Sequence, residues 1–383
     1  MKMNKYLISI VIPTKNRQKY CIEVVKQIVS LKLEDLQIVI QDNSDEDKLK
    51  EEILKLKCDD ILYNYCDKTL SFVDNFSLAL SLSSGEYVCM IGDDDGILPN
   101  IIKATKYIKA NRIDALIPGL NSVYIWPSEH PIVKGGENGY LCLSYIKNKG
   151  KLIDCSKGLH DLMNKGGQEY QSLDLPRIYH GIIKKTILDQ VKEMTGNYFS
   201  GLTPDIYMST ALSLICEKVY KVEFPVTVSG ICLKSGSANS ATGKHTGKLE
   251  DAPHFIGHDG YIWAQKVPKI YSVESIWADT VLHALNDFNA KKEQDKFRID
   301  VLDAICLKKY PQFSNEIISH ASSYGFSKFR LLLLGNYYKY LLFVKRVFRR
   351  LLRKKGEVKK YYNIPDINKA VDCTNAELRR KQL

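Results

Sequence analysis

The first 120 residues alternate short runs of consecutive apolar residues with amphipathic stretches, and this alternation constrains the fold more than any other feature. The run Tyr6–Pro13 (YLISIVIP) is apolar at nearly every position, and Leu36–Ile40 and Tyr87–Ile91 have the same character. Strands that are apolar on both sides must be covered on both faces of their sheet. Between them, stretches such as Tyr20–Leu31 carry apolar residues at helical spacing. The pattern predicts an α/β fold with a mostly parallel central sheet flanked by helices.

Polar clusters follow three of these strands, at the points where the strands end. They come directly after Ile12, after Ile40 and after Ile91. In an open parallel sheet, ligands bind in the crevice beyond the carboxyl ends of the strands. The three clusters therefore predict one binding site at that edge of the sheet.

The third cluster, Gly92-Asp93-Asp94-Asp95-Gly96, carries the strongest signal. Three adjacent carboxylates repel one another unless a cation joins them. Carboxylate and phosphate oxygens are the ligands that Mg2+ and Mn2+ prefer. Asp and Gly also form solvated acidic turns, but the position directly after a buried strand favours a metal site that neutralises a leaving diphosphate.

The other two clusters carry weaker signals when taken alone. Asp42 ends the second strand, where a carboxylate can accept a hydrogen bond from a uracil imide N–H or a ribose hydroxyl. A turn residue or a helix N-cap is the alternative for Asp42. The segment Pro13–Arg17 (PTKNR) presents backbone and side-chain donors near a helix start, where phosphate oxygens are favoured.

Together and in this order, the motifs resemble those of the family 2 glycosyltransferases, which have the GT-A fold. The resemblance rests on the segments VIPTKNR (11–17), DNS (42–44), GEY (85–87) and GDDDGILP (92–99). It covers 9–119 closely and extends more loosely to about residue 230. It implies an inverting enzyme that moves a sugar from a nucleotide-sugar, a UDP-sugar, to a hydroxyl of a glycan or lipid-linked oligosaccharide, in bacterial-type surface polysaccharide synthesis.

The resemblance also implies roles for single residues. The residues that would line the nucleotide-sugar are Pro13, Thr14, Asn16, Arg17, Asp42, Asn75, Asp93 and Asp94. Asp42 would contact the base. Asp93 and Asp95 would form the Asp-x-Asp pair that binds Mn2+ or Mg2+, completed by His245 from a later loop. Many members have Asp where this chain has Gly92, so either Asp93 or Asp94 can act as the first aspartate.

Asp205 matches the carboxylate that removes the proton from the acceptor hydroxyl in this family. It follows Thr203 and Pro204, which suit the N-cap and first position of a helix that runs to about Lys218. The family often has Glu-Asp at this point, so Pro204 is a departure. An Asp in a first turn can also serve only to stabilise the helix dipole.

Three parts are predicted along the chain. Residues 1–120 would form the nucleotide-sugar-binding half of the GT-A domain, and 121–270 its acceptor-binding half. Residues 271–383 would form a helical extension, because the pattern stays helical from Tyr271 to about Lys355.

The segment 329–360 of this extension is basic and amphipathic. Nine Lys or Arg residues and a single Glu fall between Lys345 and Lys360, which accounts for +8 of the net charge of +11. Such a helix binds the interface of an anionic membrane. Packing of its apolar side on the catalytic domain is the alternative. The rest of the chain is nearly neutral and has no aromatic-basic recognition motif, which argues against a nucleic-acid partner.

The cysteines and the N-terminus predict a compartment. The ten cysteines include no Cys-x-x-Cys pair, and several lie in apolar runs, which is typical of reduced, buried residues. The chain enters its first strand without a signal-peptide pattern. We therefore expect a cytoplasmic protein, peripheral on the inner face of the cell membrane.

Two other functions stay open. A nucleotidyltransferase acting on sugar phosphates also uses nucleotides, metals and paired carboxylates. Such an enzyme usually has a glycine-rich loop after its first strand, whereas Pro13–Arg17 contains no glycine. An inactive nucleotide-sugar-binding scaffold is the non-enzymatic alternative, and the presence of both the acidic cluster and Asp205 argues against it.

Overall fold

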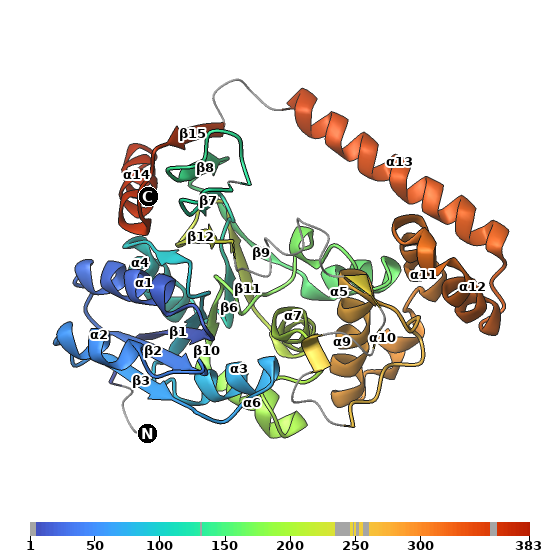
Figure 1. Ribbon diagram of the computed structural model, residues 1–383, viewed down its shortest axis with the longest axis horizontal. Coiled ribbons are helices and arrows are strands. Elements are labelled where there is room, and N and C mark those ends of the chain that lie inside the picture. The colour runs from blue at the N-terminus through green and yellow to red at the C-terminus, as the bar shows by residue number, and fades with distance from the viewer. Residues whose placement is uncertain are drawn as a thin grey trace.

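A central sheet of eight strands organises the protein. The computed structural model describes residues 5–130, 132–233, 246–247, 249, 253–255, 260–352 and 358–383. The strands of this sheet are β1 (Ile8–Thr14), β2 (Leu36–Asp42), β3 (Ile61–Tyr65), β4 (Tyr87–Met90), β6 (Ala115–Ile117), β9 (Gly150–Ile153), β10 (Ile182–Lys184) and β11 (Val219–Val222). Their order is β3-β2-β1-β4-β10-β6-β11-β9 (Figure 1). Strands β1 to β4 run parallel, and β9 and β10 are antiparallel to their neighbours. The predicted α/β fold is confirmed.

Helices cover both faces of this sheet because alternate residues of a strand point to opposite sides. In β1, Ile8, Ile10 and Ile12 join one hydrophobic core, and Val11 joins the other. The helices of the first core are α1 (Gln18–Ser30), α2 (Leu49–Lys55) and α4 (Asn100–Ala110), and those of the second are α3 (Phe72–Ser81), α6 (Lys185–Thr195) and α7 (Pro204–Ile215). The strands are therefore apolar on both sides, as their sequence indicated.

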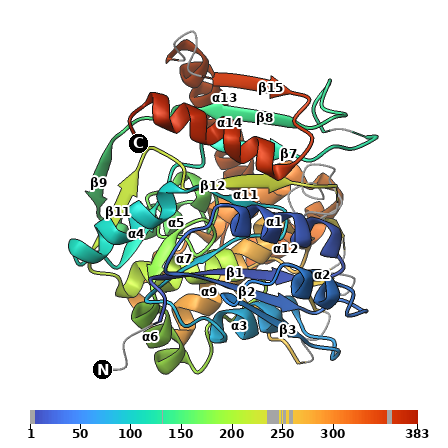
Figure 2. The ribbon, with the colours of Figure 1, turned by 90° about the vertical axis from the view of Figure 1, so that its left-hand side faces the viewer.

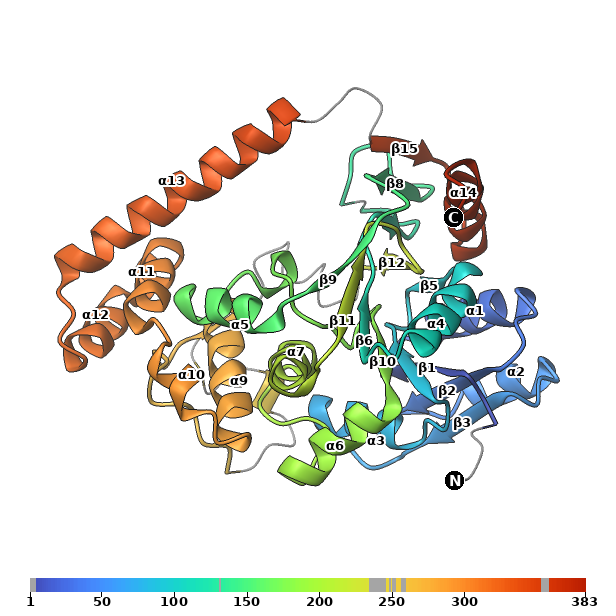
Figure 3. The same cartoon turned by 180° about the vertical axis from the view of Figure 1, so that it is seen from behind.

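A second sheet of five strands lies against one end of the first. Its strands are β5 (Gly96–Ile97), β7 (Ser122–Ile125), β8 (Tyr140–Ser144), β12 (Thr227–Ile231) and β15 (Val358–Tyr362), in the order β15-β8-β7-β12-β5. Helix α14 (Ile367–Arg380) covers this sheet (Figure 2). Its Ile367 and Val371 pack so closely over Gly96 that a Cβ there would come within 2.9 Å of Ile367. The end of the chain thus returns to the half that contains its beginning, as Figure 3 also shows.

The region after the sheets is helical. Its elements are α5 (Cys155–Asn164), α9 (Val273–Asp287), α10 (Lys291–Asp295), α11 (Ile299–Lys309), α12 (Ser314–Ser323) and α13 (Lys328–Leu352). Short 3-10 segments at Tyr170–Ser172, Pro253–Phe255 and Pro311–Phe313, and a small strand pair of β13 (Thr246–Gly247) and β14 (Tyr271–Ser272), complete the description. Within the described part of the chain, no helix is both long enough and apolar enough to cross a bilayer.

The predicted elements of the first 120 residues agree closely with the structure. The strand predicted over 36–40 is β2, which continues to Asp42, and the helix predicted over 20–31 is α1, which begins two residues earlier. The helical pattern after Tyr271 continues to Leu352, but strand β15 and helix α14 follow it in the 271–383 part.

Candidate active site

Three strands of the central sheet end at one edge, and the predicted motifs gather there. Thr14 and Asp42 end β1 and β2 in register with each other. Asp93 follows β4 and bonds back to β1, since the Thr14 hydroxyl donates to Asp93 Oδ2 at 2.5 Å. The polar clusters after the three strands therefore form a single site, as the topology of a parallel sheet requires.

Arg17 brings a positive charge to the aspartates. Its Nε donates to Asp93 Oδ2 at 3.1 Å, and its Nη2 contacts the other oxygen of Asp93 and lies 3.5 Å from Asp94 Oδ1. Asp93 is only 1% exposed. Burial raises the pKa of its carboxyl to about 6, although Arg17 and Thr14 act in the opposite direction. The guanidinium therefore offsets part of the cluster's negative charge.

Backbone N–H groups of β12 and of the residue after it donate hydrogen bonds to the other two aspartates. The Gly230 N–H donates to Asp95 Oδ1 at 2.7 Å, and the Cys232 N–H donates to Asp94 Oδ2 at 3.0 Å. The second oxygen of Asp95 accepts the Gly92 N–H at 2.6 Å. The acidic turn is therefore a built junction between the two sheets rather than a solvated loop, and its carboxylates are held in fixed directions.

Gly230 is essential to this junction because β12 passes directly over the aspartate backbone. A Cβ at Gly230 would lie 1.7 Å from the Asp94 carbonyl oxygen, which is backbone and cannot rotate away. We expect Gly230→Ala to destabilise the protein by at least about 1–3 kcal/mol and to reduce ligand binding at the site. Denaturant unfolding measures the first effect.

The matched control for that prediction is Gly247→Ala, where the nearest atom to a new Cβ is Tyr271 Cδ1 at 3.8 Å, an ordinary contact. If the two variants unfold at the same denaturant concentration, then β12 does not lie as close to the aspartate backbone as in this structure.

The loop after β1 is tied to the loop after β2. Asn16 has a φ of +56°, its backbone N–H donates to Ser44 Oγ at 2.8 Å, and its side chain exchanges two hydrogen bonds with Asp45. Lys15 Nζ donates to Asn43 Oδ1 at 3.2 Å. These contacts fix the predicted nucleotide-binding segment that contains Pro13, Thr14, Asn16 and Arg17.

Asp42 is fully buried, and both of its oxygens have partners. Oδ1 accepts the Ser44 N–H at 2.9 Å, which is an Asx turn, and Oδ2 lies 3.1 Å from the Tyr63 hydroxyl. Burial raises the pKa of Asp42, and these hydrogen bonds oppose that shift. The turn role that the sequence left open is thus present, and a contact with a base stays a prediction.

Asn75, from α3, lies behind the loop. Its Nδ2 is 3.4 Å from the Thr14 carbonyl oxygen, and its Oδ1 is buried and accepts no hydrogen bond. An unpaired buried amide oxygen is costly unless a ligand or water meets it. Asn75 therefore offers a hydrogen-bond-accepting oxygen at the edge of the site. The resemblance places Asn75 among the residues that line the nucleotide-sugar.

Asp205 lies in the first turn of α7 and accepts a short hydrogen bond from the Tyr170 hydroxyl. Burial raises the pKa of Asp205, and the bond from Tyr170 lowers it. Thr203 is the N-cap residue, but its hydroxyl reaches Thr280 Oγ1 at 3.2 Å instead of capping α7. The pKa of Tyr179 is raised mainly by burial, and the carboxylates of Asp205 and Asp95 raise it further. Asp205 and the aspartate cluster therefore both influence the ionisation of this tyrosine.

His180 is a site residue that sequence reasoning missed. It has a φ of +61°, its Nδ1 lies 2.9 Å from Thr227 Oγ1, and its Nε2 lies 3.6 Å from Asp95 Oδ2. Burial lowers its pKa to about 4, so the imidazole is neutral near pH 7. Its backbone N–H donates to the Met90 carbonyl, which brings the segment beside the end of β4. An isolated histidine without a motif carried no signal of this position.

The carboxylate oxygens of the aspartate cluster are of the kind that binds a divalent cation. Asp93 Oδ1 is buried and accepts no hydrogen bond of normal geometry, although Arg17 lies against it. Oxygen donors of this kind suit Mg2+ or Mn2+. In the residues that the structure describes, no three metal-ligating side chains are already arranged around a common point. His245, predicted as a further ligand, lies outside the described residues.

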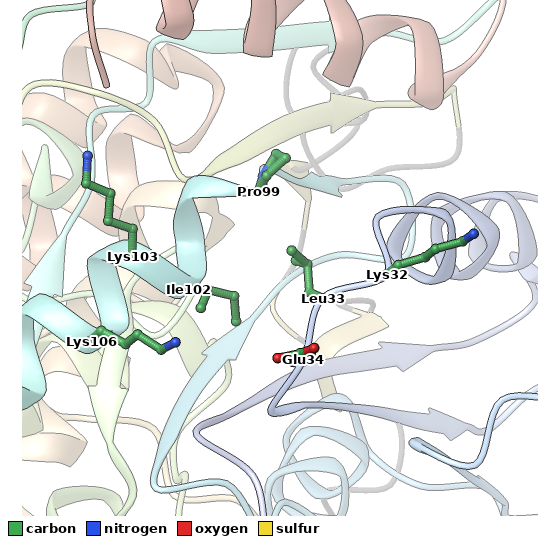
Figure 4. A pocket seen from close by; sticks show the side chains of 7 residues that line it. All are labelled: Lys32, Leu33, Glu34, Pro99, Ile102, Lys103 and Lys106. Carbon is green, nitrogen blue, oxygen red and sulfur yellow. The ribbon is translucent and has the colours of Figure 1, made fainter.

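A shallow pocket of about 500 Å³ lies at the opposite edge of the sheet. Its lining comes from the turn before β2 and from the start of α4, and includes Lys32, Lys103 and Lys106. Figure 4 shows the three amino groups at separate places around the pocket, so they do not converge on an anion. The turn before β2 lies at the amino end of that strand, away from the aspartates.

The chain is similar to one protein family and to several solved structures. Residues 9–127 match the family model described as glycosyl transferase family 2. No curated protein matches the chain. The chain is similar to S. aureus TarS 1–349 in complex with UDP, with 12% identity, a TM-score of 0.46, and coverage of 87% of this chain and 91% of that chain.

It is also similar to the mannosyltransferase PcManGT from Pyrobaculum calidifontis in complex with GDP-Man and Mn2+, with 13% identity, a TM-score of 0.40, and coverage of 99% and 88%. At these TM-scores the similarity carries no argument about ligands. The family match covers the strands, the loop after β1 and the aspartate cluster described above. Residues 9–127 match glycosyl transferase family 2, and the chain is a glycosyltransferase whose described residues form a mixed α/β fold.

Proposed function

We propose that this glycosyltransferase moves a sugar from a UDP-sugar to a hydroxyl of a glycan or lipid-linked oligosaccharide, with inversion in a single displacement. The observation that carries the proposal is the placement of two carboxylate groups of different kind. The aspartate cluster lies at the carboxyl edge of the sheet with Arg17. Asp205 lies in the first turn of α7, and its carboxylate and that of Asp95 both raise the pKa of Tyr179, after burial as the main cause.

The donor half of the site would hold the nucleotide-sugar. Thr14 and Arg17 would turn toward the diphosphate, because a guanidinium binds phosphate oxygens strongly. Asn75 and Asn16 would line the nucleoside, and Asp42 would meet the base. A Mn2+ or Mg2+ ion held by Asp93 and Asp95 would supply Lewis-acid stabilisation of the leaving diphosphate when bound.

The acceptor half would use Asp205 as the general base. The acceptor oxygen attacks the anomeric carbon while its proton passes to the Asp205 carboxylate, and the bond from that carbon to the diphosphate oxygen breaks. The Tyr170 hydroxyl, which donates to Asp205 Oδ2, orients the carboxylate. A base positioned in this way contributes about a hundredfold to ten-thousandfold in rate.

Incubation with a panel of labelled nucleotide-sugars and sugar acceptors tests the proposal. We expect labelled sugar to appear on an acceptor hydroxyl, with release of a nucleoside diphosphate. Release of pyrophosphate from a nucleoside triphosphate and a sugar phosphate would instead identify a nucleotidyltransferase. Binding that raises the melting temperature without any turnover would identify a scaffold.

The proposed location is the cytoplasmic face of an anionic membrane, reached through the segment 329–360. A lipid-linked acceptor is confined to that surface, so an enzyme that extends it must work there. The basic charge of 345–360 supports this location.

A further inference from the structure

Helix α13 has an inner side that packs on the protein. Leu331 is fully buried and forms a small core with Ala304 of α11 and Ala321 of α12. Gly335 permits the close approach, because a Cβ there would come 3.0 Å from the Ala304 carbonyl oxygen. Arg330 adds an ion pair with the buried carboxylate of Asp300. The inner side therefore accounts for how the helix is attached.

The outer side of the same helix is apolar and faces solvent. Eight large apolar side chains on α13 are exposed, out of nineteen in the described part of the chain. They are Phe329, Leu332, Leu333, Tyr337, Tyr340, Phe343, Val347 and Phe348. Their spacing of three and four residues places them along one side of the helix. We call this set the outer face of α13, and in Figure 1 the helix lies at the periphery of the molecule.

A patch of this kind is unusual on a protein that remains monomeric in water. The exposed fractions of Phe329, Tyr340 and Phe343 are 70%, 63% and 62%. Contiguous exposed apolar surface of this extent marks an interaction site. The predicted alternative, in which the apolar side packs on the catalytic domain, does not describe these eight residues, because other residues of α13 make the packing contacts.

The positive charge of α13 indicates which kind of surface the helix can bind. The sequence of α13 contains seven Lys or Arg residues and no Asp or Glu. Two of them, Arg330 and Lys345, pair with Asp300 and Glu169 of the body. A second copy placed on the outer face by two-fold symmetry would bring two sets of cations together, which opposes association. An anionic lipid surface satisfies both the apolar side chains and the cations.

We infer that the outer face of α13 lies in the interface of an anionic bilayer, with the helix axis parallel to the membrane plane. The exposed Lys339 and Arg346 would reach the lipid phosphates, while Tyr340 and Phe343 enter the region between headgroups and acyl chains. Contact of this face with the bilayer rests on the proposed function in one respect only: a lipid-linked acceptor would explain why the enzyme works at a membrane.

Vesicle co-sedimentation without donor or acceptor tests the inference separately from catalysis. The full chain should bind vesicles of phosphatidylcholine mixed with phosphatidylglycerol, bind phosphatidylcholine alone weakly, and lose affinity as salt screens the lipid charge. The double variant Tyr340→Glu, Phe343→Glu should bind anionic vesicles at least about tenfold more weakly, because each substitution removes apolar area and adds a like charge.

The control is the double variant Leu54→Glu, Ile262→Glu, whose side chains are 68% and 79% exposed on other parts of the surface. It should bind vesicles as the parent protein does, and both variants should unfold at the same temperature as the parent. Equal vesicle binding by the two double variants would overturn the inference. A dimer of the parent in solution that the α13 variant dissociates, without vesicle binding by either protein, would also overturn it and identify a self-interface. Sugar transfer to a water-soluble acceptor, measured in parallel, tells whether the proposed function fails independently.

Discussion

Replacing Asp205 with Asn is expected to lower the turnover number at least about a hundredfold and to leave the affinity for the nucleotide-sugar unchanged. The amide has nearly the shape of the carboxylate, so α7 and its contact with Tyr170 can persist. It cannot take the proton of an acceptor hydroxyl. The donor would bind at the aspartate cluster and the loop after β1, which Asp205 does not touch. Initial rates and calorimetric titration with the donor measure the two quantities.

The variant Tyr170→Phe separates proton transfer from packing at Asp205. The hydrogen bond from Tyr170 lowers the pKa of Asp205, whereas burial raises it. Without the hydroxyl, the Asp205 carboxyl should have a higher pKa, so the acid limb of the pH–rate profile should move to higher pH. The maximal rate should fall less than in Asp205→Asn. A normal rate for Asp205→Asn would mean that the base lies elsewhere and that Asp205 only stabilises the start of α7.

Asp95→Asn is expected to remove metal-dependent turnover, again by at least about a hundredfold, because Lewis-acid stabilisation of a leaving diphosphate is worth several kcal/mol. The melting temperature of the variant with nucleoside diphosphate should no longer rise when manganese is added. The exposed carboxylate of Asp67, on the loop after β3, provides the matched control as Asp67→Asn.

Asn is preferred to Ala at position 95 for a structural reason. Asp95 accepts the backbone N–H groups of Gly92 and Gly230, and Ala would leave the buried Gly230 donor and the part-buried Gly92 donor without this partner. Each such loss costs about 1–3 kcal/mol, which would confuse an effect on the fold with an effect on metal binding. Asn keeps one acceptor oxygen. Full manganese-dependent turnover in Asp95→Asn, with the control equally active, would contradict the role proposed for Asp95.

The central sheet could be predicted because its signal is local. Strands β1, β2 and β4 are continuous apolar runs, and each is followed by the polar residues of the site. The site residues that were missed depend on long-range contacts. Gly230 and Cys232 meet the aspartates more than a hundred residues away in sequence. His180 approaches Asp95 only because its segment bonds to the end of β4. No spacing within one segment contains that information.

Helix α13 illustrates a different limit. Its sequence has apolar residues on two sides, with Leu331 on one and Tyr340 on the other. A hydrophobic pattern shows that a helix is amphipathic, but only its neighbours decide which side is covered. Here Gly335 and the small residues Ala304 and Ala321 select the inner side. The outer side then remains exposed.

The return of the chain's end to its first half has a consequence for biosynthesis. Strand β15 completes the edge of the second sheet by pairing with β8, and α14 buries Ile367 and Val371 in the core that also contains β1 and α1. A ribosome delivers β15 and α14 after the other strands of both sheets, so the surface that they cover stays exposed while the 213 residues between Ser144 of β8 and Val358 of β15 are made. Intermediates of this kind expose apolar surface and aggregate readily. Protein that lacks residues 358–383 should therefore accumulate as inclusion bodies, and demand for chaperones should persist until these residues have been made.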